Sequence, residues 1–329
     1  MLFRSLGDGD DVLLLRATAA ATTLIALGGN GNDAMTVGTQ RSLSLIGGAL
    51  QLRGEGGQDT LTFDDSDDSA ANSGSLSATG VTGLGLGTTA AYETIETLAL
   101  RLGSGADSLC VNSSNAATAT SVDGGIGDDV LTVGDTAAGM RNVAGALSLQ
   151  GGGGIDALVV DDRAGAQLTG VVNTGVVTGF GAAGISHGNI ENIDISTSTV
   201  AQNILLQSTA DGTRTRVLFG TGVNNVVLGS SGGAPTLNAL AGAIVLVDGG
   251  GRNTILADDR GDTTANTGTL SSAALTGFGL GRLGVAFTGP LASLDLRLGS
   301  GTNVLALQSS PAGVTNVSGG SGADTPVLL

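Results

Sequence analysis

The sequence has few of the residues on which most enzymes and nucleic-acid-binding proteins depend. Among its 329 residues there is no Trp, no Lys, one Tyr, one Cys, one His and four Pro. Without lysine no P-loop can form, and a single histidine excludes both a His-rich metal site and a triad base repeated along the chain. One cysteine fits a reducing compartment as well as an extracellular protein without disulfides. No apolar segment is long enough for a signal peptide or a transmembrane helix.

The charge balance argues against nucleic acid or an anionic membrane as a binding partner. Acidic residues outnumber basic ones by 29 to 13, which gives a net charge of −16 at pH 7. Nearly all of the acids are Asp, 25 against four Glu. Asp favours turns and hard-cation sites, whereas an acidic helical surface would be built largely from Glu. We therefore expect the acids in turns, and no insertion into a membrane.

A glycine-rich turn, an acid and a short apolar alternation recur from one end of the chain to the other. The clearest copy is GGIGDDVLTV at 124–133, and Asp-Asp pairs at 64–65, 161–162 and 258–259 are each 97 residues apart. Within one such repeat the loops fall 22, 27 and then roughly 47 residues apart, which fits four turns of about 24 residues. The sequence therefore predicts an all-β fold, a parallel β-solenoid (β-helix) with about 24 residues per rung and four rungs per 97-residue repeat.

Period-two patterns follow the loops and predict short strands with one inward face. The expected inward residues include Leu109, Val111, Leu131, Val133, Leu158 and Val160. Residues 92–102 have the pattern of an amphipathic helix, but their counterparts at 188–196 and 289–299 alternate cleanly, so all three are predicted to be strands. Because residues 7–33 align with 103–129 at an offset of 96, the chain begins mid-repeat. We expect 1–329 to be a single continuous solenoid within a longer repeat array, with repeat marks at 64, 161 and 258.

Each loop carries one side chain at a fixed position, and its chemistry changes along the chain. The series reads Asp11, Asp33, Asp59, Asp107, Asp129, Asp156, Gln202, Asn224, Asn253, Asn303 and Asp324. Carboxylates stacked ~4.8 Å apart repel by about 1 kcal/mol in water and roughly 3.5 at an effective dielectric of 20, and a divalent ion between them would turn repulsion into attraction. In the alternative interpretation the Asp side chains bond loop amides and splay toward solvent. Neutral amides can form hydrogen-bonded ladders without a metal.

The loop motif GGxGxDxUx, in which U is apolar, resembles the nonapeptide of the RTX, or haemolysin-type, calcium-binding proteins. The resemblance implies that loop carbonyls and the Asp carboxylate bind Ca²⁺ between stacked turns. By the resemblance alone, Asp33 and Asp129 would be ligands. With the rest of the acidic loop series, the expected metal ligands are Asp11, Asp33, Asp59, Asp107, Asp129, Asp156 and Asp324. Calcium is expected in the loops through Asp156 and not in those from Gln202 to Asn303. RTX nonapeptides run in tandem, whereas one motif recurs here per coil, so a standard RTX roll is excluded.

Over its whole length the chain is similar in composition and architecture to the Gly- and Asp-rich repeat arrays of large secreted bacterial surface proteins. The resemblance implies an extracellular or cell-surface location and a non-enzymatic role as a spacer, a stalk or an adhesin-like rod stiffened by calcium. The partners it implies are neighbouring repeats of the same parent chain. Cell-surface polysaccharide and other surface proteins are further candidate partners.

Two other functional classes are left open. An extracellular polysaccharide-acting β-helix enzyme would need a unique cleft with cationic and aromatic residues, whereas the Asp-Asp pairs recur in every repeat and suggest a structural role. A carbohydrate-binding or ice-binding face would need one rank of Thr or aromatic residues on every rung. The residues expected to point outward after the loops are mixed: Thr36, Thr62, Cys110, Thr132, Val159, Val227 and Leu256.

Overall fold

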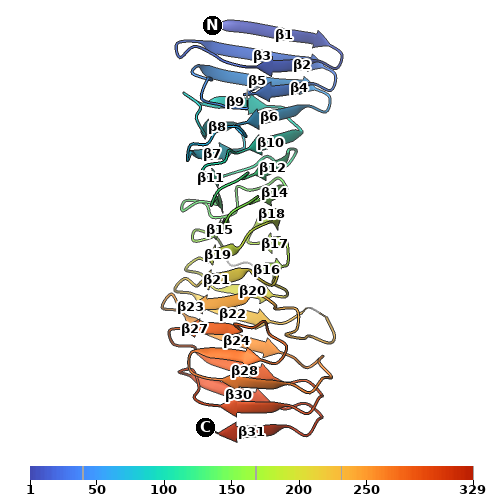
Figure 1. Cartoon of the computed structure of the whole chain (residues 1–329), viewed down its shortest axis with the longest axis vertical. Coiled ribbons are helices and arrows are strands. Elements are labelled where there is room, and N and C mark those ends of the chain that lie inside the picture. The colour runs from blue at the N-terminus through green and yellow to red at the C-terminus, as the bar shows by residue number, and fades with distance from the viewer. Residues whose placement is uncertain (39–40, 167–168, 231, 329) are drawn as a thin grey trace. The chain divides into compact units, whose positions relative to one another are not determined.

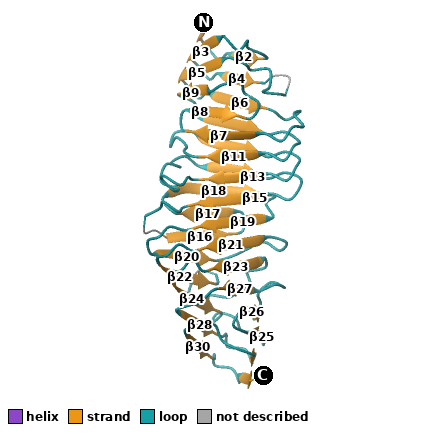
Figure 2. Cartoon of the chain, turned by 90° about the vertical axis from the view of Figure 1, so that its left-hand side faces the viewer, coloured by secondary structure: helices purple, strands orange, loops and turns teal. Residues whose placement is uncertain are grey.

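The computed structural model describes residues 1–38, 41–166, 169–230 and 232–328. Throughout these residues the chain forms strands and turns and no helix, as Figure 2 shows. The strands belong to two many-stranded, mostly parallel sheets, here named sheet A and sheet B. The predicted fold class, an all-β parallel β-solenoid, is confirmed. In the described part of the chain there is no helix that could span a membrane.

The described chain divides into two compact units. Unit 1 comprises Met1–Gly134, Met140–Val159 and Ala182–Ile190, and unit 2 comprises Asp135–Gly139, Val160–Gly181 and Glu191–Leu329. The strand β15 (Ala157–Asp161) begins in unit 1 and ends in unit 2. The single continuous solenoid expected from the repeats stays a prediction.

In unit 1 the two sheets are built from short strands that alternate along the chain (Figure 1). Sheet A contains, in spatial order, β1 (Leu2–Asp8), β3 (Thr23–Asn30), β5 (Ala49–Gly56), β9 (Ala90–Glu93), β8 (Gly80–Gly83), β7 (Ser73–Ser77), β11 (Ser108–Val111) and β13 (Val130–Val133). Sheet B contains β2 (Val12–Leu15), β4 (Ala34–Val37), β6 (Thr60–Asp64), β10 (Thr97–Arg101), β12 (Ala119–Asp123), β14 (Leu147–Gln150) and β18 (Ala182–Gly188), all parallel.

Unit 2 repeats this plan. Its part of sheet A contains β19 (Asn192–Ser196), β21 (Arg214–Leu218), β23 (Ala243–Val247), β27 (Val285–Thr288), β26 (Ala274–Gly277), β25 (Thr267–Leu270), β29 (Val304–Leu307) and β31 (Thr325–Leu328). Its part of sheet B contains β17 (Val176–Gly179), β16 (Thr169–Asn173), β20 (Gln202–Leu206), β22 (Val223–Leu228), β24 (Arg252–Asp258), β28 (Ser293–Arg297) and β30 (Val314–Ser318).

The strand register shows where the repeat departs from a uniform coil. In sheet B, Leu13 pairs with Met35 and Met35 with Leu61, at intervals of 22 and 26 residues, which fit a rung of about 24. The next interval, from Leu61 to Leu98, is 37 residues. It is longer because the chain first forms β7, β8 and β9 in sheet A, where β8 runs antiparallel to both β7 and β9. Only then does it return to β10 in sheet B. The long interval of each repeat therefore holds an antiparallel excursion rather than a loop-bearing coil.

The excursion exchanges the roles of the two sheets within unit 1. In the first three coils the chain enters each glycine loop from sheet A, at β1, β3 and β5, and leaves it in sheet B. After the excursion the chain enters the loops from sheet B, at β10, β12 and β14, and leaves them in sheet A. The loops of unit 1 consequently form two separate columns.

The core is the narrow aliphatic interior predicted from the period-two pattern. The six residues expected to point inward are all fully buried: Leu109, Val111, Leu131, Val133, Leu158 and Val160. Burying each such side chain stabilises the fold by roughly 1.5–3 kcal/mol. Residues 97–101 and 192–196 are strands, as predicted, because Ile193 and Ile195 enter the core while Asp194 between them stays partly exposed.

Candidate metal-binding loops

The first loop column of unit 1 is a ladder of carboxylates. The amide N–H of Asp11 donates to Oδ1 of Asp33 at 2.9 Å, and that of Asp33 donates to Oδ1 of Asp59 at 2.8 Å. The amide of Asp59 donates in turn to Oε2 of Glu96 at 2.8 Å. Each carboxylate thus holds the backbone of the preceding coil. Glu96 closes the column, a role that the loop motif did not predict.

The second column follows the same rule at the other set of loops. The amide of Asn72 donates to Oδ1 of Asp107 at 2.7 Å, Asp107 donates to Asp129 at 2.7 Å, and Asp129 donates to Asp156 at 2.8 Å. These carboxylates are buried, Asp129 completely. The alternative in which they splay toward solvent is therefore wrong, although they do bond loop amides. Asn72 begins this column. It lies outside the glycine-loop motif, so the sequence did not point to it.

The loops differ in whether the second carboxylate oxygen, Oδ2, has a hydrogen-bond donor. Among the described residues, Oδ2 of Asp33, Asp59 and Asp129 is buried and has no hydrogen-bond partner, and the same holds for Oδ2 of Asp11. A buried polar atom left unpaired costs roughly 1–3 kcal/mol, and more if it carries charge. Asp107 differs, because its Oδ2 accepts the amide N–H of Gly103 at 3.0 Å.

The first glycine of the motif leaves space for Oδ2 of the Asp because it has no side chain. A Cβ added to Gly124 would lie 2.6 Å from Oδ2 of Asp129 and 2.2 Å from the carbonyl oxygen of Gly151 on the next coil. At Gly28 the corresponding distances are 2.2 Å to Oδ2 of Asp33 and 2.5 Å to the carbonyl of Gly54. In these two loops a carboxylate oxygen and a carbonyl oxygen of the next coil both lie close to one glycine.

Burial makes these carboxylates hard to ionise. Burial raises the pKa of Asp129 to about 6, against the opposing hydrogen bond with the Asp107 amide and with help from the neighbouring carboxylates of Asp107 and Asp156. Burial also raises the pKa of Asp59, and the carboxylates of Asp33 and Glu96 add to the effect. A positive charge beside Oδ2 would relieve this cost.

The donors present suit a hard cation and limit how one would be held. Carboxylate and carbonyl oxygens are the ligands that calcium prefers. Within the described ranges, no group of three or more His, Cys, Asp or Glu side chains is placed to hold a metal ion together. An ion beside Oδ2 would therefore be held by at most two such side chains, with backbone carbonyls as further ligands.

In unit 2 the amide residues supply their own donors. Nδ2 of Asn303 donates to the carbonyl oxygens of Gly299 and Gly301, at 3.1 and 3.0 Å, within its own loop. Nδ2 of Asn224 donates to Oδ1 of Asn253 at 2.8 Å, and Nδ2 of Asn253 donates to Asp248 at 2.7 Å. One step of an amide ladder, from Asn224 to Asn253, is thus present, and Asn253 and Asn303 donate to groups outside the amide series.

Two residues of the series depart from this pattern. Gln202 bonds outside its loop as well as within it, because its Nε2 donates to Oδ2 of Asp162 and to Oγ of Ser198, both at 2.9 Å. Asp324 has donors on both oxygens, because Oδ1 accepts from Asn303 and Oδ2 accepts the amide N–H of Gly320, each at 3.0 Å. Asp324 is therefore the weakest of the predicted metal ligands.

The Asp-Asp pairs split into an outer and an inner residue. The outer ones pair with arginine, as Asp161 does with Arg163 at 2.6 Å and Asp258 with Arg260 at 2.8 Å. The inner ones are buried, and Oδ1 of Asp65 accepts the amide N–H of Leu43 at 2.7 Å. The strict spacing of the pairs in the sequence marks them as repeated features. It does not show which Asp of a pair contacts arginine and which accepts a backbone amide.

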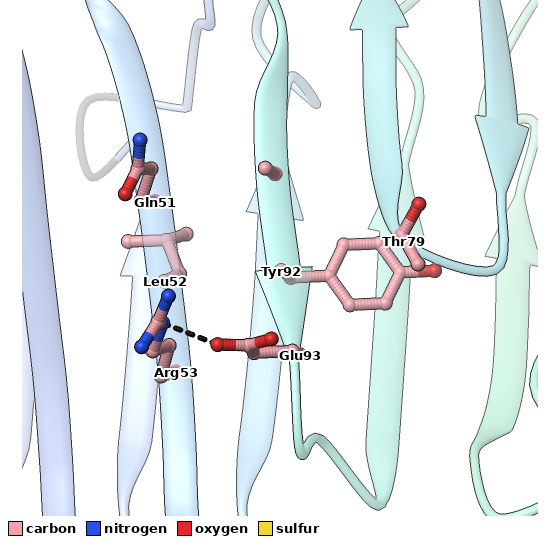
Figure 3. A pocket seen from close by; sticks show the side chains of 7 residues that line it. Gln51, Leu52, Arg53, Thr79, Tyr92 and Glu93 are labelled. Atoms are coloured by element: carbon pink, nitrogen blue, oxygen red, sulfur yellow. Dashed lines mark ion pairs between the residues drawn. The ribbon is translucent and has the colours of Figure 1, made fainter.

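A shallow cavity of about 360 Å³ lies on sheet A of unit 1, lined by Gln51, Leu52, Arg53, Thr79, Ala91, Tyr92 and Glu93 (Figure 3). Its charged groups, Arg53 and Glu93, form an ion pair with each other. The Tyr92 hydroxyl donates to the carbonyl of Ser77 at 2.6 Å, and burial raises its pKa to about 12. The polar groups of this cavity are thus engaged with the protein itself.

No family model, no curated protein and no solved structure matches the chain.

Proposed function

We propose that the chain is a non-enzymatic structural segment, a spacer, stalk or adhesin-like rod of a secreted or cell-surface protein, whose acidic loops are stiffened by calcium. The observation that carries the proposal is the contrast at one loop position. Asn303 directs an N–H at the loop carbonyls, whereas Asp33, Asp59 and Asp129 direct an unpaired oxygen at a carbonyl. A positive charge beside Oδ2 would complete the loops of Asp33, Asp59 and Asp129, whereas the Asn303 side chain already donates within its own loop.

The loops are not equivalent as calcium sites in this proposal. Asp33, Asp59 and Asp129 combine a buried, unpaired Oδ2 with a carbonyl of the next coil, and they are the strongest candidates. Asp107 is weaker because Gly103 already donates to its Oδ2. When bound, calcium would neutralise the stacked carboxylates and join adjacent coils; the neighbouring repeats of the parent chain are the partners that such a rod requires.

The test is a calcium titration of the 329-residue protein followed by far-ultraviolet circular dichroism and thermal unfolding, with magnesium as the control ion. We expect calcium to raise the unfolding temperature and magnesium to have a much smaller effect, because Mg²⁺ demands a near-ideal octahedral shell. Unfolding curves that are identical with calcium and with chelator would remove calcium from the proposed function. They would leave the role of structural spacer standing.

One observation favours a second candidate, a carbohydrate-binding or ice-binding face. One outward column of sheet B in unit 1 begins at Leu14 and then consists almost entirely of small residues with hydroxyl groups: Thr36, Thr62, Ala99, Ser121, Ser148 and Ser186. Co-sedimentation with insoluble polysaccharide and ice-shaping assays test it. Ser121→Lys should abolish binding, and Thr132→Lys on sheet A should not.

A further inference from the structure

The only histidine of the chain occupies a position where the other coils carry core residues. In sheet B of unit 1, Leu100 pairs with Val122, Val122 with Leu149, and Leu149 with His187 on β18. The first three are buried aliphatic side chains. The inward column that they form therefore ends in an imidazole.

The other two repeats show what this position normally holds. The strands β9 and β27 hold the place of β18 in the other two repeats. On β9 Tyr92 lies opposite Leu52, and on β27 Phe287 lies opposite Leu246. Tyr92 places its hydroxyl on the carbonyl of Ser77, and Phe287 needs no partner. In the described structure Nε2 of His187 is buried and has no hydrogen-bond partner.

In the described part of unit 1, no titratable side chain lies on the strand that pairs with β18. β18 itself has no other titratable residue, and neither β14 nor β13 has one. Asp129 and Asp156 lie in the adjoining loops, where they bond each other, and Glu191 is the next titratable residue along the chain. Burial alone lowers the pKa of His187, and none of these carboxylates offsets it.

We propose that His187 makes β18 an acid-sensitive strand, which detaches from β14 when the imidazole takes up a proton while the inner strands of unit 1 stay paired. The free energy that holds β18 is fully present above the unfolded-state pKa of about 6.5 and is lost as the pH falls below it, because the unfolded strand binds the proton more readily. Protonation would place a charge on a half-buried ring whose buried Nε2 has no hydrogen-bond partner in the described structure. This inference does not depend on calcium.

The test is hydrogen exchange of the amides at 185–188 at pH 7.5 and pH 5.0, corrected for intrinsic rates, in the native protein and in His187→Phe. Phe is the residue that the third repeat uses. We expect protection at 185–188 to fall up to about tenfold per pH unit below pH 6.5 in the native protein and to stay constant in the variant. Amides at 120–123 serve as the internal control, and they should not lose protection.

Two results would overturn the proposal. One is the same loss of protection in the native protein and in His187→Phe. The other comes from the native protein alone, so that it does not depend on the folding of a variant: an imidazole pKa at or above 6.5, measured by nuclear magnetic resonance, contradicts a histidine held neutral by burial. Tyr92→His sharpens the test, because it should make β9 sensitive to acid in the same way.

Discussion

The loops of unit 1 and those of unit 2 share a glycine-rich backbone. They differ in one side-chain atom, which is an oxygen at Asp129 and a nitrogen at Asn303. At Asp129 the frame encloses a carboxylate oxygen that no donor reaches, and at Asn303 it encloses an N–H that bonds two loop carbonyls. Exchanging an oxygen for an NH₂ group thus completes the loop from within. The comparison teaches that the Asn303 loop satisfies its own carbonyls, whereas the Asp129 loop leaves a buried oxygen without a donor in the described structure.

Both kinds of loop depend on the same core, so the largest effect is expected there. Leu131→Asp should destabilise the protein by about 4 kcal/mol, because an unpaired carboxylate would enter the aliphatic interior. Thr132→Asp, one residue further on the outer face, should cost less than about 1 kcal/mol. Urea unfolding measures both, and similar midpoints for the two variants would mean that the inward and outward faces are reversed.

The next effect concerns the glycine that makes room for the carboxylate. Gly124→Ala should cost roughly 1–3 kcal/mol, because its Cβ would press on Oδ2 of Asp129 and on the Gly151 carbonyl. Gly153→Ala is the matched control in the neighbouring loop, where an added Cβ meets nothing within 4 Å. Thermal unfolding compares the two variants. Equal losses would show that the space around Oδ2 does not constrain the loop.

Exchanging the two side chains, Asp129 in unit 1 and Asn303 in unit 2, should reverse the difference between their loops. Asp129→Asn should stabilise the protein in chelator by about 1 kcal/mol, since Nδ2 can donate where Oδ2 could not, and it should reduce the stabilisation by calcium. Asn303→Asp should do the opposite in unit 2. Calorimetric unfolding with calcium and with chelator measures both. If Asp129→Asn left the response to calcium unchanged, Asp129 would not be a ligand.

A smaller effect should appear with pH, because a proton can replace the cation. The pKa of Asp129 is raised to about 6, so the folded state binds more protons than the unfolded state between about pH 4 and pH 6. In chelator, stability near Asp129 should therefore be highest at the acid end of this window and decline as the pH rises through 6. Exchange of the amides at 130–133 at pH 5 and pH 7.5 measures it, and Asp129→Asn should remove the decline.

The repeat chemistry was predictable from the sequence, and the long-range topology was not. Leu131 and Val133 were assigned to the core because period-two alternation reports directly on the faces of a strand. The excursion at β7 to β9 was not predicted, because its antiparallel pairs join Gly-rich segments without a strong apolar pattern. The exchange of sheets follows from that excursion, and so do the ends of the columns at Glu96 and Asn72, whose partners lie 37 and 35 residues away.

The buried side chains of the Asp-Asp pairs show a second limit of sequence reasoning. Asp64 and Asp65 look alike in the sequence and both are buried, yet Asp64 lies beside Arg101 while Asp65 accepts the amide N–H of Leu43. The difference arises from packing against a coil about 22 residues earlier, which no local pattern encodes. The same packing raises the pKa of Asp65 and of its counterpart Asp259 to about 6, chiefly through burial.

The most direct test of the central claim is hydrogen exchange of the 329-residue protein with calcium and with chelator. It compares the amides at 103–160, where the loops carry Asp107, Asp129 and Asp156, with those at 220–307, where the loops carry amides. Calcium should increase protection strongly in the first window and little in the second, because the loops of the first window carry carboxylates, with a buried Oδ2 that lacks a donor at Asp129, whereas the loops of the second carry neutral amides. Equal changes in both windows, or no change in the first, would contradict the account and leave these aspartates as turn residues.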